Sequence, residues 1–373
     1  MSWSWKIGRI AGIPIYIHWT FLILIAWIVY GQTMAGHDLA AIVEAVVFVL
    51  ALFGCVVLHE LGHALAARRY GVPTSDITLL PIGGVARLQR IPEKPAEELV
   101  VALAGPAVTL VIAFVLLAVG VRLPVDPENP QALIQMGFFP KLLLVNIFIL
   151  LFNLLPAFPM DGGRVLRALL AMRLEYARAT RIAAWIGQFM AVLFGFLGLA
   201  SGNPVLLLIA LFVWIGAGAE ATQVEERMML RGARVRDAML TDYQTLDPSD
   251  TLSQAADLLL AGSQPDFPVL SDGRPAGLLT RGALLNGLSK AGGSARVADF
   301  LHPELGVVEA DSMLVPAVAR LRESEGHCLQ VVDRGEPVGL LTLENIGELL
   351  MVRSALSSRT AHAQVRVLDR STV

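Results

Sequence analysis

Six apolar stretches, each close to the twenty residues that a helix needs to cross about 30 Å of hydrocarbon, constrain most strongly what this chain can fold into. They lie at 13–32, 40–66, 99–120, 141–160, 183–201 and 204–221. With 55% hydrophobic and only 16% charged residues, the 373-residue chain is too apolar for a soluble domain of this size. The sequence therefore predicts an integral membrane protein with six transmembrane helices.

Basic residues are distributed unevenly among the segments that flank these stretches. Lys6 and Arg9 precede the first stretch, and groups of arginines follow the second and the fourth, whereas the other loops carry only Arg122 and Lys141. Cytoplasmic loops are enriched in Lys and Arg. We therefore expect a protein of a bacterial or archaeal cell membrane with both termini in the cytosol, and with the second and fourth spans ending at the same cytoplasmic depth.

Charge and cysteine content exclude two other kinds of chemistry. The formal net charge is −3 and no dense Lys/Arg tract is present, so no nucleic-acid partner is expected. Cys55 and Cys328 offer neither a CxxC spacing nor a disulfide framework, so we expect both to be packing residues.

The composition changes after Ala221, where charged residues become frequent and no later apolar run is long enough to span. This part contains an ungapped internal repeat, because Val235 and Val297 are separated by the same 62 positions as Thr280 and Thr342 (297 − 235 = 62; 342 − 280 = 62). Each copy predicts short helices alternating with strands. The predicted divisions are a membrane domain at 1–222, a linker at 223–230, repeat copies at 231–290 and 291–353, and a disordered tail at 354–373.

The second apolar stretch ends in His59-Glu60-Leu61-Gly62-His63. Two histidines four residues apart lie on one face of a helix and can share a metal ion. Glu60 is placed to act as the general base, which takes a proton from the attacking water in zinc peptidases. The alternative is a chance occurrence on a polar helix. It is disfavoured because ionisable side chains inside an apolar stretch cost free energy and are commonly functional.

A catalytic zinc site uses three protein ligands and leaves one position open, so a third ligand is required. Asp161 is the strongest candidate at matching depth. It follows the segment 153–160 and precedes Gly162-Gly163, and two prolines and two glycines interrupt the fourth helix at this point. Broken backbone in a membrane is tolerated only where protein or a wet cavity satisfies its polar groups, which favours a site here. The alternative role for Asp161 is an interfacial helix cap.

Four motifs together carry a resemblance to a known family. With HELGH at 59–63, NLLPAFPMDGG at 153–163, Gly-Gly at 83–84 and Ala-Gly-Pro at 104–106, the membrane part resembles the site-two protease family of intramembrane metalloproteases. The resemblance implies one Zn²⁺ per chain, held by His59, His63 and Asp161, with Glu60 as the catalytic base.

The soluble repeat resembles a pair of CBS modules, as in the branch of that family with such a pair at its C-terminus. The PDZ domain of other family members is not expected, because no external loop is long enough to hold one. The implied fold class is a polytopic α-helical membrane domain followed by a cytosolic α/β CBS pair.

Three further features are candidates for substrate binding. The segment 74–88, which contains Gly83 and Gly84, is either a membrane-dipping hairpin whose edge strand pairs with an extended substrate or a simple connector. Asn146, inside the fourth span, either contacts substrate or makes an interhelical hydrogen bond. His18 either lines the site or is an interfacial, internally hydrogen-bonded side chain, and we favour the second reading.

CBS pairs in other proteins often bind adenosine nucleotides. The resemblance places such a ligand beside Thr280 in the first copy and beside Thr342 and Asn345 in the second. The ribose-binding aspartate expected three residues after each Thr is replaced by Ala283 and Asn345. We therefore expect either a nucleotide sensor, with better binding beside Thr342, or a module that is structural or joins two chains in a homodimer.

These features together predict regulated proteolysis of a transmembrane protein substrate, for which a membrane-tethered transcription regulator is one candidate. Two other functions compete with this one. A CBS-regulated channel or transporter would have no use for Glu60, and a scaffold that has lost activity would have no need for all four chemical positions to be intact.

Overall fold

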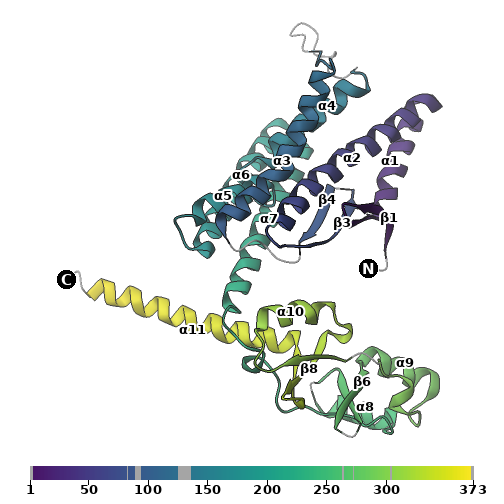
Figure 1. The fold of residues 1–373 in the computed structure, drawn as a ribbon, viewed down its shortest axis with the longest axis vertical. Helices are drawn as coiled ribbons and strands as arrows, with labels where there is room; N and C mark the ends of the chain where they lie inside the picture. Colours follow the sequence, from purple (N-terminus) through teal and green to yellow (C-terminus); the bar gives the residue numbers. More distant parts are fainter. Residues whose placement is uncertain are drawn as a thin grey trace. The chain divides into compact units, whose positions relative to one another are not determined.

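The computed structural model describes residues 3–81, 83–88, 94–124, 136–262, 264–271, 273–302 and 305–370. The chain divides into two compact units, Met1–Val224 and Glu225–Val373. Figure 1 shows the path of the chain through both units.

The first unit combines a helical bundle with a small sheet. Its helices are α1 (Thr20–Met34), α2 (Leu39–Arg69), α3 (Pro95–Ala118), α4 (Phe138–Asn153), α5 (Asp161–Ala171), α6 (Tyr176–Ser201) and α7 (Pro204–Met229), the last of which extends a few residues into the second unit. Its strands are β1 (Ser4–Ile10), β2 (Ile13–His18), β3 (Thr74–Leu80) and β4 (Gly83–Leu88).

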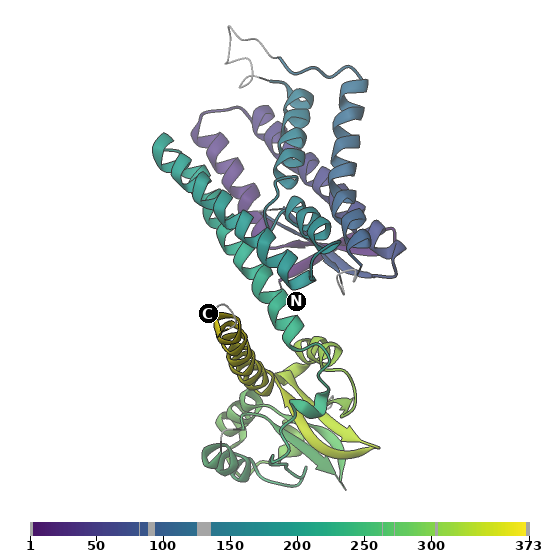
Figure 2. The ribbon, with the colours of Figure 1, turned by 90° about the vertical axis from the view of Figure 1, so that its left-hand side faces the viewer.

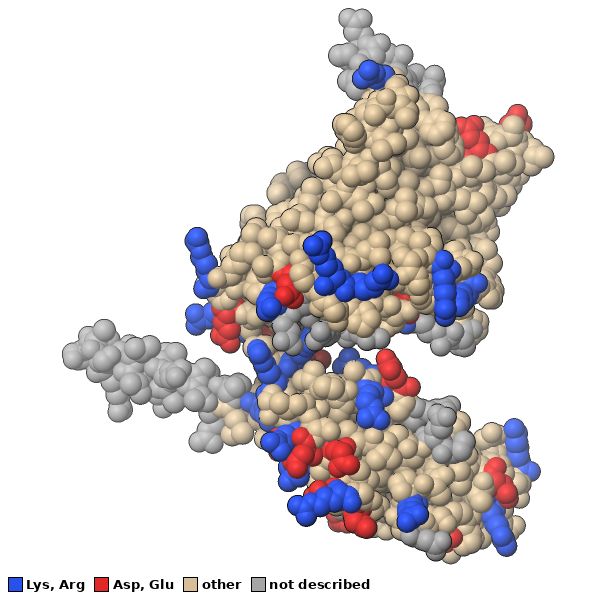
Figure 3. Space-filling model, viewed as in Figure 1, with Lys and Arg blue, Asp and Glu red and all other residues tan. Residues whose placement is uncertain are grey.

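Among the described residues, four helices are long and apolar enough to cross a membrane: α2, α3, α6 and α7. Only 11–33% of the residues in their most apolar windows are buried within the protein. Apolar side chains left uncovered on this scale are typical of a surface that faces lipid. Figure 3 shows a broad uncharged band on the viewed face of this unit, with most of the Lys and Arg residues gathered at one end of the band.

The prediction of six full-length spans is not confirmed, because two of the stretches form shorter helices. The stretch 13–32 begins as strand β2, and α1 has 15 residues, which rise about 22 Å. The alternation of Ile13, Ile15 and Ile17 with other residues has the period of a strand and explains this difference. The stretch 141–160 is helical only to Asn153, because Pro156 and Pro159 cannot continue the helix.

The four strands form one sheet in the order β1-β2-β3-β4, in which β2 and β3 are parallel and the other neighbours are antiparallel. β3 and β4 form the hairpin that was one of the two alternatives predicted for 74–88. One face of the sheet packs on α1 and α2, where Ile77 and Leu79 join Phe21 and Val57 in a single core cluster. Figures 1 and 2 show the sheet lying across one end of the helices, with β4 as an edge strand beside α2.

The second unit has the repeated architecture that the sequence predicts. Its first copy contains α8 (Leu252–Ala261), β5 (Phe267–Ser271), β6 (Arg274–Leu279) and α9 (Arg281–Ala291), and its second copy contains β7 (Gly306–Glu309), α10 (Leu314–Glu323), β8 (Cys328–Asp333), β9 (Glu336–Thr342) and α11 (Leu343–Arg370). Of its 3-10 helices, η2 (Val235–Asp237) precedes α8, η3 (Val297–Asp299) follows α9, and η4 (Glu325–His327) follows α10. Helices α8 and α10 begin at positions that differ by the repeat offset (314 − 252 = 62).

Two details of this unit bear on the predictions. Helix α11 continues to Arg370, which differs from the disorder predicted for 354–373; no Gly or Pro interrupts it after Gly347, and residues 371–373 lie outside the described part. Cys328 is buried at the start of β8, and burial raises the pKa of its thiol to about 12. A thiol with so high a pKa is almost wholly protonated at neutral pH, which fits the packing role expected for it.

Candidate metal and catalytic site

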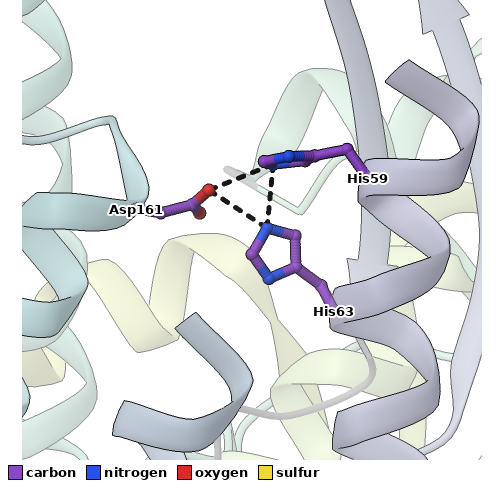
Figure 4. A group of neighbouring side chains, drawn as sticks. All are labelled: His59, His63 and Asp161. Atoms are coloured by element: carbon purple, nitrogen blue, oxygen red, sulfur yellow. Dashed lines mark hydrogen bonds and ion pairs between the residues drawn. The ribbon is translucent and has the colours of Figure 1, made fainter. Parts of the chain in front are cut away.

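Helix α2 brings His59 and His63 to one face, and the first residue of α5, Asp161, points at them from the opposite side (Figure 4). The three ligand atoms form a triangle with equal sides. The distances His59 Nε2 to His63 Nε2, His59 Nε2 to Asp161 Oδ2 and His63 Nε2 to Asp161 Oδ2 are all 3.1 Å. All three residues are buried, and they are the only group of this kind among the described residues.

The partners of the outer imidazole nitrogens indicate that the inner nitrogens carry lone pairs. His63 Nδ1 lies 2.7 Å from the carbonyl oxygen of Val101, which can only accept, so Nδ1 carries the proton. Thr109 Oγ1 donates to Gly105 O at 3.4 Å and lies 2.9 Å from His59 Nδ1, so this nitrogen is also the donor. Both Nε2 atoms then face a carboxylate oxygen with no proton between them.

These three ligand atoms fit a zinc ion. Two imidazole nitrogens and one carboxylate oxygen are the ligand types of catalytic zinc sites, and ligand atoms 2.0–2.1 Å from a tetrahedral ion lie about 3.3 Å apart. Three converging lone pairs in a buried place repel one another unless a cation lies between them. The arrangement therefore calls for a bound cation.

The segment before α5 is shaped by its prolines and glycines. Residues 154–160 form a tight non-helical connection that ends α4 and starts α5, and its Ala157 and Met160 are buried between α6 and α7. A Cβ on Gly162 would overlap Leu155 O, and one on Gly163 would lie 2.6 Å from Phe158 N. The glycines thus let α5 begin directly against this connection, which sets the position of Asp161.

Helix α3 lines the other side of the site through Gly105. A Cβ on Gly105 would overlap His63 Nε2 and lie 2.7 Å from His59 Nε2. A Cβ on Gly62 of α2 would in turn lie 2.7 Å from the carbonyl oxygen of Ala104. The two helices approach closely because both carry glycine at their contact.

The side chain of Glu60, which belongs to α2, faces the edge strand β4. Its Oε2 accepts a hydrogen bond from the backbone N–H of Ala86 at 3.2 Å, and a Cβ on Gly84 would lie 2.8 Å from its Cγ. Gly83 has a φ of 143°, a conformation that favours glycine. Gly83 and Gly84 therefore let the strand approach Glu60, which adjoins His59 in sequence and lies three residues before His63.

Asn146 and His18, the other two residues predicted to bind substrate, have different surroundings. Asn146 is buried on α4, where its Nδ2 donates to Leu142 O at 2.8 Å. Among the described residues its Oδ1 has no hydrogen-bond donor. His18 Nδ1 pairs with Thr20 Oγ1 at 2.8 Å, next to the start of α1, and His18 is not part of the metal group.

In the second unit the candidate nucleotide residues cap helices. Thr280 Oγ1 accepts from the N–H of Ala283 at 3.2 Å, and Thr342 Oγ1 accepts from the N–H of Asn345 at 3.3 Å. The hydroxyl of Thr342 also donates to Asn345 Oδ1 at 2.7 Å. A Cβ on Gly326 of the second copy would lie 3.0 Å from Thr280 Cγ2, so the second copy packs closely on the first beside Thr280.

Three kinds of residue that support the metal group, or the helix that carries Asp161, were not predicted from the sequence. Thr109 and the Val101 carbonyl orient the histidines, and Gly105 leaves room for the ion. Arg167, counted above among the cytoplasmic arginines, is fully buried and paired with two glutamates. Only Gly105 gave a sequence signal, as part of the Ala-Gly-Pro segment, because the other contacts join distant positions.

Comparison with known proteins finds matches to both units. The model of peptidase family M50 matches residues 47–138 and 128–194, and the CBS domain model matches residues 235–290. A zinc metalloprotease of Methanocaldococcus jannaschii is 33% identical over 346 residues, which cover 93% of this chain and 96% of the relative.

Two solved structures are also similar to parts of the chain. The site-2 protease from Methanocaldococcus jannaschii is 39% identical, covers 59% of this chain and 95% of its own, and has a TM-score of 0.44. The CBS-pair protein CBSX2 from Arabidopsis thaliana is 26% identical, covers 35% of this chain and 98% of its own, and has a TM-score of 0.30.

An apolar helical unit that joins two histidines and an aspartate, and that is followed by a CBS domain, defines a membrane-bound zinc metalloprotease. The chain belongs to peptidase family M50, the site-two protease family.

Proposed function

We propose that this zinc metalloprotease cleaves membrane-embedded protein substrates within the bilayer, with His59, His63 and Asp161 as the ligands of one zinc ion and Glu60 as the general base. The observation that carries the proposal is the buried triangle of lone pairs, 3.1 Å on each side, at the end of an apolar helix. Ionisable residues in such a helix mark a function by default.

Each residue has a distinct task in this reaction. When bound, zinc supplies a Lewis acid that activates water and polarises the peptide carbonyl. Glu60 takes the proton from the attacking water and passes it to the leaving amine. The hydrogen bond from Ala86 N–H holds the Glu60 carboxylate through Oε2, and among the described residues its other oxygen accepts no hydrogen bond.

The edge of β4 is the proposed binding site for the substrate backbone. β4 pairs only with β3 among the described strands, so no described strand occupies its other edge, although Ala86 N–H already donates to Glu60. An extended peptide can add to such an edge by main-chain hydrogen bonds. The substrate helix must unwind first, and the buried Oδ1 of Asn146 is an acceptor suited to a freed backbone N–H.

We also propose the membrane topology predicted from the basic residues. In this arrangement α1 and α4 cross the bilayer with the four longer helices, both termini lie in the cytosol, and the sheet lies near the cytoplasmic face. The gathering of Lys and Arg at one end of the uncharged band supports this orientation. The cleaved segment then leaves on the cytoplasmic side, as expected for a membrane-tethered regulator.

The proposed role of the CBS pair is regulation, either by an adenosine nucleotide or by joining two chains. Every group assigned to the chemistry lies before Val224, and the described part of the second unit has no group of metal ligands. The domain divisions 1–222, 223–230 and 231–353 belong to the same proposal.

The decisive experiment uses the purified chain reconstituted in vesicles with a labelled transmembrane peptide. We expect cleavage inside the apolar segment of the peptide, located by mass spectrometry, and none with Glu60→Gln. Cleavage confined to the aqueous flanks would contradict proteolysis within the bilayer. Ion or solute flux that persists in Glu60→Gln vesicles would support a transporter instead.

A further inference from the structure

A second group of charged side chains, largely buried, is centred on Arg167 of α5, six positions after Asp161 (167 − 161 = 6), and takes no part in the chemistry described so far. Arg167 on α5 is fully buried, and its Nε donates to Glu98 Oε1 of α3 at 2.7 Å. Its Nη1 donates to Glu220 Oε1 of α7 at 2.6 Å. Its Nη2 also lies 2.6 Å from Glu98 Oε1. One guanidinium thus joins three helices.

The same guanidinium contacts the connection that precedes Asp161. The Arg167 Cζ atom lies 5.0 Å from the centroid of the Phe158 ring, which is also buried, and 5.2 Å from that of Tyr176. Arg167 therefore touches the segment before the third ligand and belongs to the helix that begins with it. The Arg167 side chain thus holds the segment before Asp161 and the helix that follows it.

Helix α7 meets this connection at a second point on the same face. A Cβ on Gly216 would lie 2.6 Å from Pro159 Cδ, and Gly216 lies one helical turn before Glu220. Helix α7 also contains Val224 and Glu225, the last residue of the first unit and the first residue of the second. A single helix thus packs on the segment next to Asp161 and continues into the CBS unit.

A buried ion pair is weak support for stability, because the cost of removing the charges from water offsets most of their attraction. One arginine here also faces two glutamates, so its partners are not matched one to one. What such a group provides is geometry, since the planar guanidinium fixes the directions of its partners. A metal site needs its ligands held within a fraction of an ångström, and residues outside the ligand set often supply that constraint.

We infer that Arg167 is a positioning residue for the metal site. It holds Asp161 in place by fastening α5 to Glu98 of α3 and to Glu220 of α7. Because α3 also orients both histidines through Thr109 and Val101, the Glu98 contact sets the third ligand relative to the other two. The Glu220 contact makes α7 the element through which a change in the CBS unit would reach Asp161. This inference rests on the proposed ligand set.

The test uses the full chain in detergent. Chelator competition gives the zinc affinity, the visible absorption of the Co²⁺-substituted protein reports the ligand geometry, and cleavage assays give kcat and KM. We expect Arg167→Met to weaken zinc binding by about 10–100-fold, as is typical for residues that orient ligands. The Co²⁺ spectrum should change and kcat should fall while KM stays constant. Arg167→Lys should recover part of the loss, because an ammonium can pair with a glutamate but lacks the planar fork.

Two further variants keep the test decisive if Arg167→Met fails to fold. Glu220→Leu leaves a neutral Arg167–Glu98 pair and should shift zinc affinity and the Co²⁺ spectrum in the same direction, by a smaller factor. The triple variant Arg167→Met, Glu98→Gln, Glu220→Gln leaves no unpaired carboxylate in the buried group. Arg173→Met, at an exposed arginine just after α5, is the control and should match the wild type.

A folded Arg167→Met or triple variant with wild-type zinc affinity and Co²⁺ spectrum would overturn the positioning role. Wild-type values in Glu220→Leu would overturn the connection through α7. Asp161→Ala separates these failures from failure of the proposed function. If Asp161→Ala kept full zinc affinity, the ligand set itself would be wrong, whereas loss of zinc in Asp161→Ala with unaffected Arg167 variants would reject the positioning role alone.

Discussion

Gly105 of α3 lies so close to His63 that a methyl group on Gly105 would occupy the space in front of the Nε2 atoms of both His63 and His59. The space that a metal ion requires is therefore kept open by the missing side chain of a residue on a different helix. We expect Gly105→Ala to lose zinc and cleavage together, because the added methyl would overlap His63 Nε2 and crowd His59 Nε2.

The control for this variant is Gly54→Ala, on α2, where an added Cβ meets no atom within 4 Å. Elemental analysis of both purified proteins measures the outcome. Full zinc occupancy in Gly105→Ala would mean that the ion does not lie between the three ligand atoms.

Metal binding and catalysis should separate at neighbouring positions of α2. Glu60 lies outside the triangle of ligand atoms and bonds to Ala86, so Glu60→Gln should retain zinc and lose cleavage. His59→Ala should lose both, because it removes a ligand. Zinc content and peptide cleavage are measured on the same preparations, and cleavage at the normal rate by Glu60→Gln would refute the general-base assignment.

Asp161 should be the ligand that joins α5 to α2. Asp161→Ala leaves two histidines and should lower zinc affinity severely, whereas Asp161→His should restore part of it because imidazole is also a good zinc ligand. Chelator competition measures both variants. If Asp161→Ala kept its zinc, another residue would be the third ligand, and His18 would be tested first.

Thr109 should affect metal binding through its hydrogen bond to His59, without being a metal ligand itself. Thr109→Val keeps the shape of the side chain but leaves the buried His59 Nδ1–H without its acceptor, so we expect zinc affinity to fall by about 10–100-fold. Thr180→Val is the matched control. Thr180 is equally buried, but its hydroxyl bonds only to Tyr176 O of its own helix. Equal zinc affinities in the two variants would remove Thr109 from the site.

The CBS pair should tune cleavage without supplying chemistry. A chain truncated after Arg227 should insert and bind zinc, with cleavage changed in rate or substrate choice but not abolished. If a nucleotide binds, linkage limits its effect to its differential affinity for two conformations, typically about 5–150-fold. Complete loss of zinc on truncation would refute the separation of the two functions.

The position of any nucleotide is a separate prediction. Because Gly326 of the second copy packs beside Thr280, whereas Thr342 pairs with Asn345, we expect binding beside Thr342 if ATP, ADP or AMP binds at all. Calorimetry on the full chain compares Thr342→Ala with Thr280→Ala. Tight binding that only Thr280→Ala abolishes would reverse this order.

Features that depend on local geometry were predictable from the sequence. Two histidines four residues apart share a helix face whatever surrounds the helix, so HELGH predicts half of a metal site by itself. The repeat is equally local, because two copies of one pattern predict two copies of one architecture. The break before Asp161 follows from Pro and Gly, which act on the backbone at their own positions, whereas the hairpin at 74–88 was one of two alternatives.

Features that depend on which helices meet were decided only by the tertiary structure. The sequence offered Asp161 as a ligand, but its approach to within 3.1 Å of residues about a hundred positions away depends on how α5 packs against α2 and α3. The strand at 13–18 was missed because an apolar run reads equally as a span until a sheet partner is known.

Arg167 is the clearest case of this division. In sequence it is one of several arginines after the fourth span, and counting charges assigns it to a cytoplasmic loop. In the structure it is buried between Glu98 and Glu220, which lie 69 and 53 positions away. A charge is stable in such a place only when partners from other helices surround it, and the sequence carries no local record of those partners.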